Sequence, residues 1–292
     1  YGRRSLDDFI DQLDIDDIAK LLVGGTNLVY GADTCSIGIL EKYGVPGLQT
    51  ADGPLGVRFG KGIKSTQFPA TDMMIGTFDV ELARAFGRAM GEEARQLGVN
   101  VLLAPGVNLS RHPTCAREIE FMGEDPCLAG RMSAAEICGI QSTGVAATIK
   151  HFAANNRINS CKNCMSVLSE RAAREIYMKQ FEIAIKEARP MCVMTAYNGM
   201  NGRYAGANWG MIEGILRGEW GFQGLVMTDW DAQSLFWQDI SSGNDVKMPG
   251  DGGGTAYFKS AAKTGLVHRD AIRASLKRVL KLVSTLRYGR SL

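Results

Sequence analysis

The sequence predicts an α/β fold in the form of a (β/α)8 TIM-like barrel, with room for irregularity in its first strands. Short apolar runs bounded by glycine alternate with amphipathic helical stretches, and short links join them. Such alternation is typical of βαβ units in a parallel sheet. Polar or ionisable residues close four of the runs at the same end, at Asp52, Lys150-His151, Tyr197 and Asp229. In a barrel, this end of the strands carries the active site.

Helical periodicity, with apolar residues three or four positions apart, places the predicted helices. Their ends carry the usual signals, since Asp79 can cap one helix, Gly98 ends it, and Pro190 closes another. The helices are expected at residues 6–23, 79–97, 128–143, 169–188, 208–219, 232–241, 255–263 and 269–286.

Short apolar runs between these helices predict six strands, at residues 44–54, 100–105, 146–151, 191–197, within 221–230, and 245–248. The segment 61–77 could hide one more. Two architectures hold such strands in a parallel sheet: the closed eightfold barrel and the open doubly wound sheet. No Gly-x-Gly-x-x-Gly follows the first strand, so nothing favours a dinucleotide-binding domain. The polar strand ends favour the barrel.

Size and charge narrow the class of protein. The chain has 292 residues, 45% of them hydrophobic and 22% charged. Barrels of this length are routinely single domains, so residues 1–292 are expected to form one. The formal net charge of +2 gives no general attraction to nucleic acid or to acidic membranes. No apolar run approaches the roughly 20 residues that span a bilayer. We therefore expect neither nucleic acid nor a membrane among the partners.

Cysteine usage bears on the compartment and on metal binding. The seven cysteines are an odd number without a disulfide framework, which favours a reducing compartment and a cytoplasmic location. Cys161 and Cys164 form the only CxxC pair in the sequence. A structural zinc site of this type needs a second pair of Cys or His ligands. The sequence therefore predicts no metal site, and nothing in it indicates a cofactor.

The residues expected at the strand ends suit carbohydrate chemistry better than phosphate chemistry. Sugar hydroxyls both donate and accept hydrogen bonds, so a carboxylate beside Lys and Arg can recognise a pyranose through paired contacts. An aromatic side chain such as Trp230 offers a flat apolar face to a sugar ring. A further Asp in such a cluster, Asp229, is free to attack.

Four motifs, in the same order along the chain, resemble glycoside hydrolase family 3, and most closely its β-glucosidase-like members. They are residues 52–58 (DGPLGVR), 150–156 (KHFAANN), 170–177 (ERAAREIY) and 226–230 (VMTDW). The resemblance covers nearly the whole chain and implies the catalytic barrel domain of a retaining glycosidase that acts on terminal β-linked glucose or a similar sugar.

The resemblance also implies roles for single residues. Asp229 matches the nucleophile that forms a covalent glycosyl-enzyme, which water then hydrolyses with net retention. Asp52 matches the residue that holds the hydroxyls of the non-reducing sugar, and Lys150 and His151 match the pair that binds the same sugar. Arg117 matches the substrate arginine.

Two aromatic residues are implied at the same rim. Tyr197 matches the tyrosine beside the nucleophile, and Trp230 matches the aromatic residue that follows it. The loop before Arg117 departs from the family pattern, with His112 where an acidic residue is usual and Thr114 where a second Arg is usual. The mobile His-Asp pair of the hexosaminidase branch has no match in residues 150–156.

The acid/base carboxylate is the missing element. In β-glucosidase-like relatives it comes from a second, α/β-sandwich domain, which we expect to be absent from this chain. The stretch Thr50-Ala51-Asp52-Gly53-Pro54 resembles members whose domain order is reversed. A second domain or chain is therefore expected as a partner. Two alternatives remain: a sugar-binding barrel that does not turn over alone, and a glycoside phosphorylase.

Overall fold

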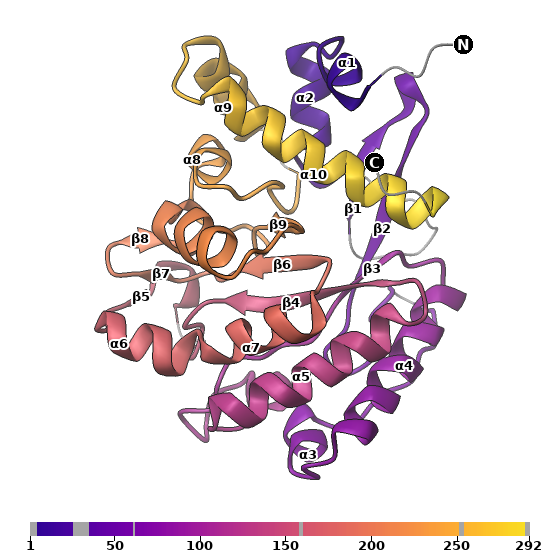
Figure 1. Ribbon diagram of the computed structural model, residues 1–292, viewed down its shortest axis with the longest axis vertical. Coiled ribbons are helices and arrows are strands. Elements are labelled where there is room, and N and C mark those ends of the chain that lie inside the picture. The colour runs from indigo at the N-terminus through magenta and orange to yellow at the C-terminus, as the bar shows by residue number, and fades with distance from the viewer. Residues whose placement is uncertain (1–4, 26–34, 61, 158–159, 251–253, 290–292) are drawn as a thin grey trace.

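The computed structural model describes residues 5–25, 35–60, 62–157, 160–250 and 254–289 (Figure 1). Its main sheet has six strands in the order β1-β2-β3-β4-β6-β9. β1 runs antiparallel to β2, and all the other pairs are parallel. The strands are β1 (Ser36–Leu40), β2 (Val45–Asp52), β3 (Val101–Leu103), β4 (Ala146–Phe152), β6 (Cys192–Thr195) and β9 (Leu225–Met227).

The sheet closes into a ring through two short segments, residues 245–248 and 22–25, which form single bridges rather than strands. The linking backbone hydrogen bonds run from Thr228 N to Val246 O (3.0 Å), from Lys247 N to Leu22 O (3.0 Å) and from Gly25 N to Ser36 O (2.9 Å). Six strands and two bridging segments make a ring of eight. The predicted TIM-like barrel is confirmed, with its irregularity at β1 and at this seam.

Asp245 anchors the seam. Its Oδ2 accepts hydrogen bonds from Val226 N of β9 (2.9 Å) and from Arg217 Nη2 (2.9 Å). Its Oδ1 accepts from Arg278 Nε (2.8 Å) and from the Ser275 hydroxyl (2.9 Å). Asp245 is fully buried, and a buried carboxylate is stable only when charged partners and donors compensate its lost hydration. One side chain therefore ties the seam to β9, to the π-helix η6 (Gly210–Glu219) and to α10 (Arg269–Tyr288).

Helices cover the strands on opposite sides. Figure 1 shows α4, α5 and α7 on one side of the strands, with α8, α9 and α10 on the other. Besides α10, the α-helices have these bounds: α1 (Leu6–Ile10), α2 (Ile15–Leu21), α3 (Thr71–Ile75), α4 (Val80–Gln96), α5 (Pro126–Gln141), α6 (Glu170–Ala172), α7 (Lys179–Ala188), α8 (Phe236–Ser241) and α9 (Gly254–Lys263). A second π-helix, Ala173–Tyr177, lies between α6 and α7. In the part of the chain that the structure describes, no helix is both long and apolar enough to cross a membrane.

Side chains that point to opposite faces in turn along the strands divide the interior into two apolar cores. In β3, Val101 and Leu103 pack into the core that includes α10, whereas Leu102 packs into the core under α4 and α5. β6 and β9 alternate in the same way. Because side chains on a strand point to opposite faces in turn, residues buried on both faces give the continuous apolar runs seen in the sequence.

Two predicted elements near the N-terminus need correction. The single helix expected at 6–23 is two helices, α1 and α2. The break arises because Asp14 caps α2, accepting hydrogen bonds from the backbone N of Asp16 (2.9 Å) and Asp17 (2.8 Å). Residues 36–40, not predicted as a strand, form β1, whose Gly38 has a positive φ of 69°. That glycine and the antiparallel pairing hide β1 from a search for βα units.

Other corrections concern short elements. The described part of 61–77 contains α3 and no strand, and residues 245–248 contribute bridges only. A small sheet of β5 (Met165–Ser166), β7 (Gly199–Met200) and β8 (Arg203–Tyr204) was not predicted. Figure 1 shows it beyond the ends of β4 and β6. Two-residue strands carry too little periodicity to be recognised from sequence.

Helices α4 and α5 pack with their backbones in contact. A Cβ added at Gly139 of α5 would lie 2.1 Å from the carbonyl oxygen of Arg84 in α4. A Cβ added at Gly87 of α4 would lie 2.1 Å from the carbonyl oxygen of Glu136. These glycines allow the close approach that sets the helix layer over β3 and β4.

We expect Gly139→Ala to lower the free energy of unfolding by about 1–3 kcal/mol, because the helices would have to separate. Urea denaturation with a constant m-value measures the change. Gly214→Ala is the matched control, because a Cβ there meets nothing within 4 Å. The control should be neutral or stabilising by up to about 1 kcal/mol, since alanine is the better helix former. Equal losses in both variants would contradict the proposed contact.

Candidate active site

One cavity at the carboxyl ends of the strands gathers all seven residues singled out in the sequence. Its volume is about 480 Å³. It is lined by Asp52, Arg58, Leu103, Arg117, Lys150, His151, Met194, Tyr197, Asp229 and Trp230. The strands position four of these side chains. Asp52 is the last residue of β2, Lys150 and His151 lie near the end of β4, and Asp229 lies two residues after the end of β9. Arg58, Leu103 and Met194 were not predicted.

Asp229 is buried, with 5% of its surface exposed. Its Oδ1 accepts a hydrogen bond from Trp230 N (2.8 Å), whereas its Oδ2 has no hydrogen-bond partner among the described residues. Burial raises the pKa of Asp229 to about 6, and the positive charges of Arg117 and Lys150 limit the rise. Near neutral pH the cavity therefore holds an ionised carboxylate with one uncommitted oxygen.

Asp52 and Lys150 form an ion pair across the cavity, with 2.5 Å between Lys150 Nζ and Asp52 Oδ1. The Lys150 side chain is 4% exposed and that of Asp52 is 39% exposed. Burial alone would raise the pKa of Asp52, but the charge and hydrogen bond of Lys150 hold it below the ordinary value. Asp52 is therefore ionised and still presents carboxylate surface to a ligand.

His151 is neutral, and its contacts define the tautomer. Burial lowers the pKa of His151 well below its usual range, and the charges of Arg117 and Lys150 act in the same direction. Nε2 lies 2.9 Å from Arg117 Nη2, which can only donate, so Nε2 accepts. The ring proton is then on Nδ1, which lies 3.3 Å from Asn108 Oδ1.

The tautomer of His151 determines whether its contact with Asp229 is an ion pair. His151 Nε2 and Asp229 Oδ2 are 3.5 Å apart. Because neither atom carries a proton, the approach is not an ion pair and leaves Oδ2 available. His151 acts here as a link that positions Arg117 beside the carboxylate.

Two residues that the sequence did not single out hold this arrangement. Asn108, 1% exposed, accepts from His151 N (2.9 Å) and donates to His151 O (3.0 Å). Glu120 accepts a hydrogen bond from Arg117 Nε. The three-residue spacing of Arg117 and Glu120 is a signal available in the sequence, whereas Asn108 gives none, since it faces His151 only through the fold.

Tyr197 and Trp230 complete the wall, both partly buried. Burial raises the pKa of Tyr197, and the negative charge of Asp229 raises it further, so the phenol stays protonated. At the rim, Lys162 Nζ lies 5.4 Å from the centre of the Tyr197 ring and 3.5 Å from Asp231 Oδ2. Among the described residues, no group of three His, Cys, Asp or Glu side chains is arranged to hold a metal ion.

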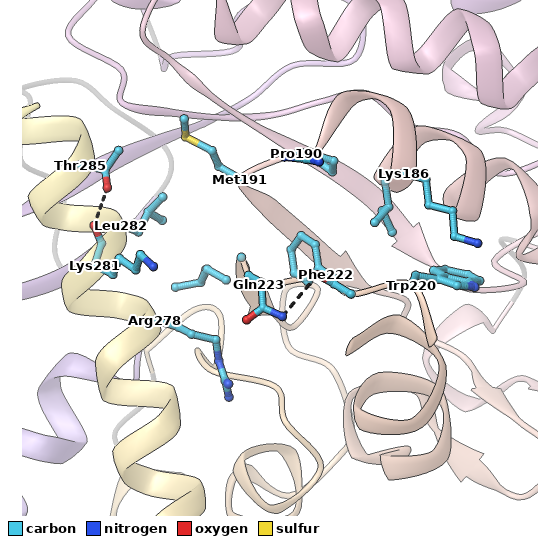
Figure 2. Close-up of a pocket in the computed structure, with 15 residues that line it drawn as sticks. Lys186, Pro190, Met191, Trp220, Phe222, Gln223, Arg278, Lys281, Leu282 and Thr285 are labelled. Atoms are coloured by element: carbon cyan, nitrogen blue, oxygen red, sulfur yellow. Dashed lines mark hydrogen bonds between the residues drawn. The ribbon is translucent and has the colours of Figure 1, made fainter. Parts of the chain in front are cut away.

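A second cavity, of about 580 Å³, lies at the opposite end of β6 and β9, where Met191 and Leu225 mark the start of the strands. Figure 2 shows its basic and apolar walls from α7 and α10, with Phe222 between them and Trp220 beside Lys186. Among the residues that the structure describes, no carboxylate lines it. Two of its cations are already paired, Lys186 with Glu182 (2.6 Å) and Arg278 with Asp245 (2.8 Å). Barrel enzymes keep their chemistry at the other face.

Comparison with known families agrees with this geometry. Residues 39–282 match the sequence model described as the glycosyl hydrolase family 3 N terminal domain. The match covers well over half of the chain. The chain belongs to glycosyl hydrolase family 3.

Family 3 relatives are similar in sequence and in structure. Beta-glucosidase B of Emericella nidulans is 43% identical over 254 residues, which cover 84% of this chain and 30% of that protein. Beta-glucosidase 3B from Thermotoga neapolitana superimposes with a TM-score of 0.91 in its complex with glycerol and 0.90 with α-D-glucose. The identity is 35%, over 98% of this chain and 44% of that one. The chain thus spans about a third of the length of the curated family 3 relatives it matches.

We expect Asp229→Asn to stabilise this family 3 chain at neutral pH. The folded state raises the pKa from 3.8 to about 6, so stability from this group is present below about pH 4 and is lost as the pH rises through about 6. The gain should be near zero at about pH 4 and reach roughly 1–3 kcal/mol above about pH 7.

Thermal and urea unfolding at several pH values measure this gain. Asp231→Asn serves as the control, because Asp231 lies at the exposed rim and pairs only with Lys162 among the described residues. A gain from Asp229→Asn that does not change with pH would refute the account of its burial.

Proposed function

We propose that this chain is the nucleophile-bearing barrel of a retaining β-glycosidase that acts on terminal β-linked glucose or a similar sugar. The observation that carries the proposal is the uncommitted Oδ2 of Asp229, buried in a cavity with Arg117 and Lys150 nearby. The names of the family 3 relatives, which are β-glucosidases, support the substrate class.

In the proposed mechanism, Asp229 Oδ2 attacks the anomeric carbon while the bond to the leaving-group oxygen breaks. The leaving group takes a proton from an acid, and a glycosyl-aspartate ester remains. The same acid group, now a base, removes a proton from water, which attacks the anomeric carbon and releases Asp229. Two inversions give net retention.

The remaining side chains suit the binding of the sugar ring in the cavity. Asp52 can accept hydrogen bonds from two adjacent hydroxyls, while Lys150 and Arg117 can donate to others. Trp230 offers an apolar face to the ring. The cations also stabilise the ionised form of Asp229, so the groups that bind the sugar keep the nucleophile charged near neutral pH.

A second domain or chain is proposed as the source of the acid/base. Asp52 and Asp229 are the only carboxylates among the described residues that line the cavity. Asp52 is unsuited to donate a proton near neutral pH, because Lys150 holds its pKa low. The relatives are about three times as long as the matched region, which leaves room for such a domain. In the assembled enzyme the two catalytic carboxyls should lie about 5–5.5 Å apart.

The same gap supports a second candidate, a sugar-binding barrel that does not turn over substrate until the partner is present. Calorimetry with glucose, beside an assay with an aryl β-glucoside, separates the two. Binding without turnover favours the second candidate. Turnover of the activated aryl glucoside favours the first, because such a leaving group needs little protonation.

Labelling with 2,4-dinitrophenyl 2-deoxy-2-fluoro-β-glucoside tests the nucleophile without an acid. We expect one sugar adduct, on the peptide that contains Asp229, and none in Asp229→Asn. Only the ionised carboxylate attacks, so the labelling rate should rise with pH and level off above the pKa of about 6. Peptide mapping by mass spectrometry identifies the site, and an adduct on another residue would end the assignment.

We expect Asp52→Asn to weaken glucose binding by roughly 10- to 100-fold, because charged hydrogen bonds to the sugar hydroxyls are lost. Calorimetry measures the affinity, and thermal unfolding shows whether the unpaired Lys150 disturbs the fold. Asp231→Asn, a matched change at the rim, should bind glucose as the native chain does. Unaltered affinity in Asp52→Asn would exclude its role in sugar binding.

A further inference from the structure

A third cavity, of about 670 Å³, lies between β8 and α8. It is lined by Gly202, Arg203, Tyr204, Ala207, Trp209, Trp237, Gln238, Ser241 and Ser242. Residues 202–209 form one wall and come after β6 in the chain, the strand that leads to Tyr197. Residues 237–242 form the other wall and come after β9, the strand that leads to Asp229. None of its lining residues lines the Asp229 cavity.

The walls of this cavity are held in place by buried contacts. The short turn η5 (Ala205–Ala207) packs against α8 so closely that a Cβ at Gly206 would lie 2.7 Å from Asp239 Oδ1. Asp239 is buried and pairs with Lys247 (3.2 Å), whose Nζ also donates to the carbonyl oxygens of Ala232 and Ser234 (2.7 Å each). The cavity is therefore a preformed feature of the fold.

Its lining combines aromatic faces with uncommitted polar groups. Trp209 is 58% exposed, and Trp237 and Tyr204 are partly exposed. Within the described residues, the side chains of Arg203, Tyr204 and Gln238 make no hydrogen bond. In the described part of the chain, Ala207 is the only aliphatic residue that lines the cavity, and no carboxylate lines it.

This composition discriminates between classes of ligand. Protein interfaces share Trp, Tyr and Arg with this cavity, but their centre is closely packed and apolar, whereas a glutamine and two serines make up much of the rest of this lining. For an anion, this lining offers a single arginine and no lysine, so it supplies one positive charge for charge-assisted hydrogen bonds. Aromatic faces with free amide, hydroxyl and guanidinium groups suit a neutral ligand that has flat apolar faces and many hydroxyls.

We propose that this cavity is a non-catalytic binding site for a neutral oligosaccharide of pyranose rings, which stack on Trp209 and Trp237. Arg203, Gln238 and Tyr204 hydrogen-bond to the ring hydroxyls. The site goes beyond the proposed hydrolysis, and only the choice of a β-linked glucan as the probe rests on that function.

The four tryptophans of the chain provide a built-in readout. Trp230 lines the Asp229 cavity, Trp220 lines the cavity of Figure 2, and Trp209 and Trp237 line this one. In ¹⁵N NMR spectra, each indole N–H gives a separate signal that a Trp→Phe variant assigns. Titration with cellohexaose should shift the signals of Trp209 and Trp237, whereas titration with glucose should shift that of Trp230. Signals of Trp209 and Trp237 that do not move with cellohexaose would overturn the proposal.

Trp209→Ala sharpens the test, because Trp209 is exposed and its loss should not unfold the chain. The Kd for cellohexaose, followed at Trp237, should rise roughly tenfold or more. Tyr257→Ala, which removes a 74% exposed aromatic side chain from α9, should leave that Kd unchanged. An unchanged Kd in Trp209→Ala would also overturn the proposal.

The fluoroglucoside reaction separates this proposal from the proposed function. Trp209→Ala should be labelled at the native rate, since the Asp229 cavity is untouched. Shifts at Trp209 without any labelling of Asp229 would refute the nucleophile and leave the oligosaccharide site standing. Labelling of Asp229 without shifts at Trp209 would support the nucleophile and overturn the oligosaccharide site.

Discussion

Burial of charge at the carboxyl ends of β2, β4 and β9 is the constraint on which the rest of the site depends. Asp229 and Lys150 are almost fully enclosed, and Arg117 and Asp52 lie beside them. A buried charge is tolerated only when it is paired or hydrogen-bonded. The barrel meets this condition by closing, because closure brings residues far apart in sequence to one rim. The neutral form of His151 is part of the same balance, since a further positive charge beside Arg117 and Lys150 would be unfavourable.

The sequence predicts the parts of the fold whose signals are local. β3, β4, β6 and β9 read as apolar runs because both of their faces are buried, and the residues that end them are visible at once. β1 and the segment 245–248 are not predicted correctly, because their pairing depends on partners distant in the chain. The break between α1 and α2 rests on one capping side chain, Asp14, within a continuous apolar periodicity.

The candidate site follows the same rule. Asp52, Lys150, His151 and Asp229 stand at strand ends and within recognisable motifs, so they can be found from sequence. Asn108 cannot, because its two hydrogen bonds to the backbone of His151 join residues 43 positions apart. The protonation of His151 and the free oxygen of Asp229 likewise come from the packed environment. Residue types can be read from the chain, whereas their charge states need the fold.

The seam of the barrel makes the fold sensitive to substitution of one residue, Asp245. Between β9 and the segment 245–248, the Asp245 carboxylate accepts a hydrogen bond from the backbone N–H of Val226, where a strand would use a backbone carbonyl. The same carboxylate forms ion pairs with Arg217 and Arg278. Loss of that one carboxyl group would leave Arg278 without its counter-charge and Arg217 with Glu213 alone, and it would weaken the seam beside the strand that leads to Asp229. Closure of the barrel at this point therefore combines backbone hydrogen bonds with the buried charge of one side chain, next to the strand that leads to the candidate nucleophile.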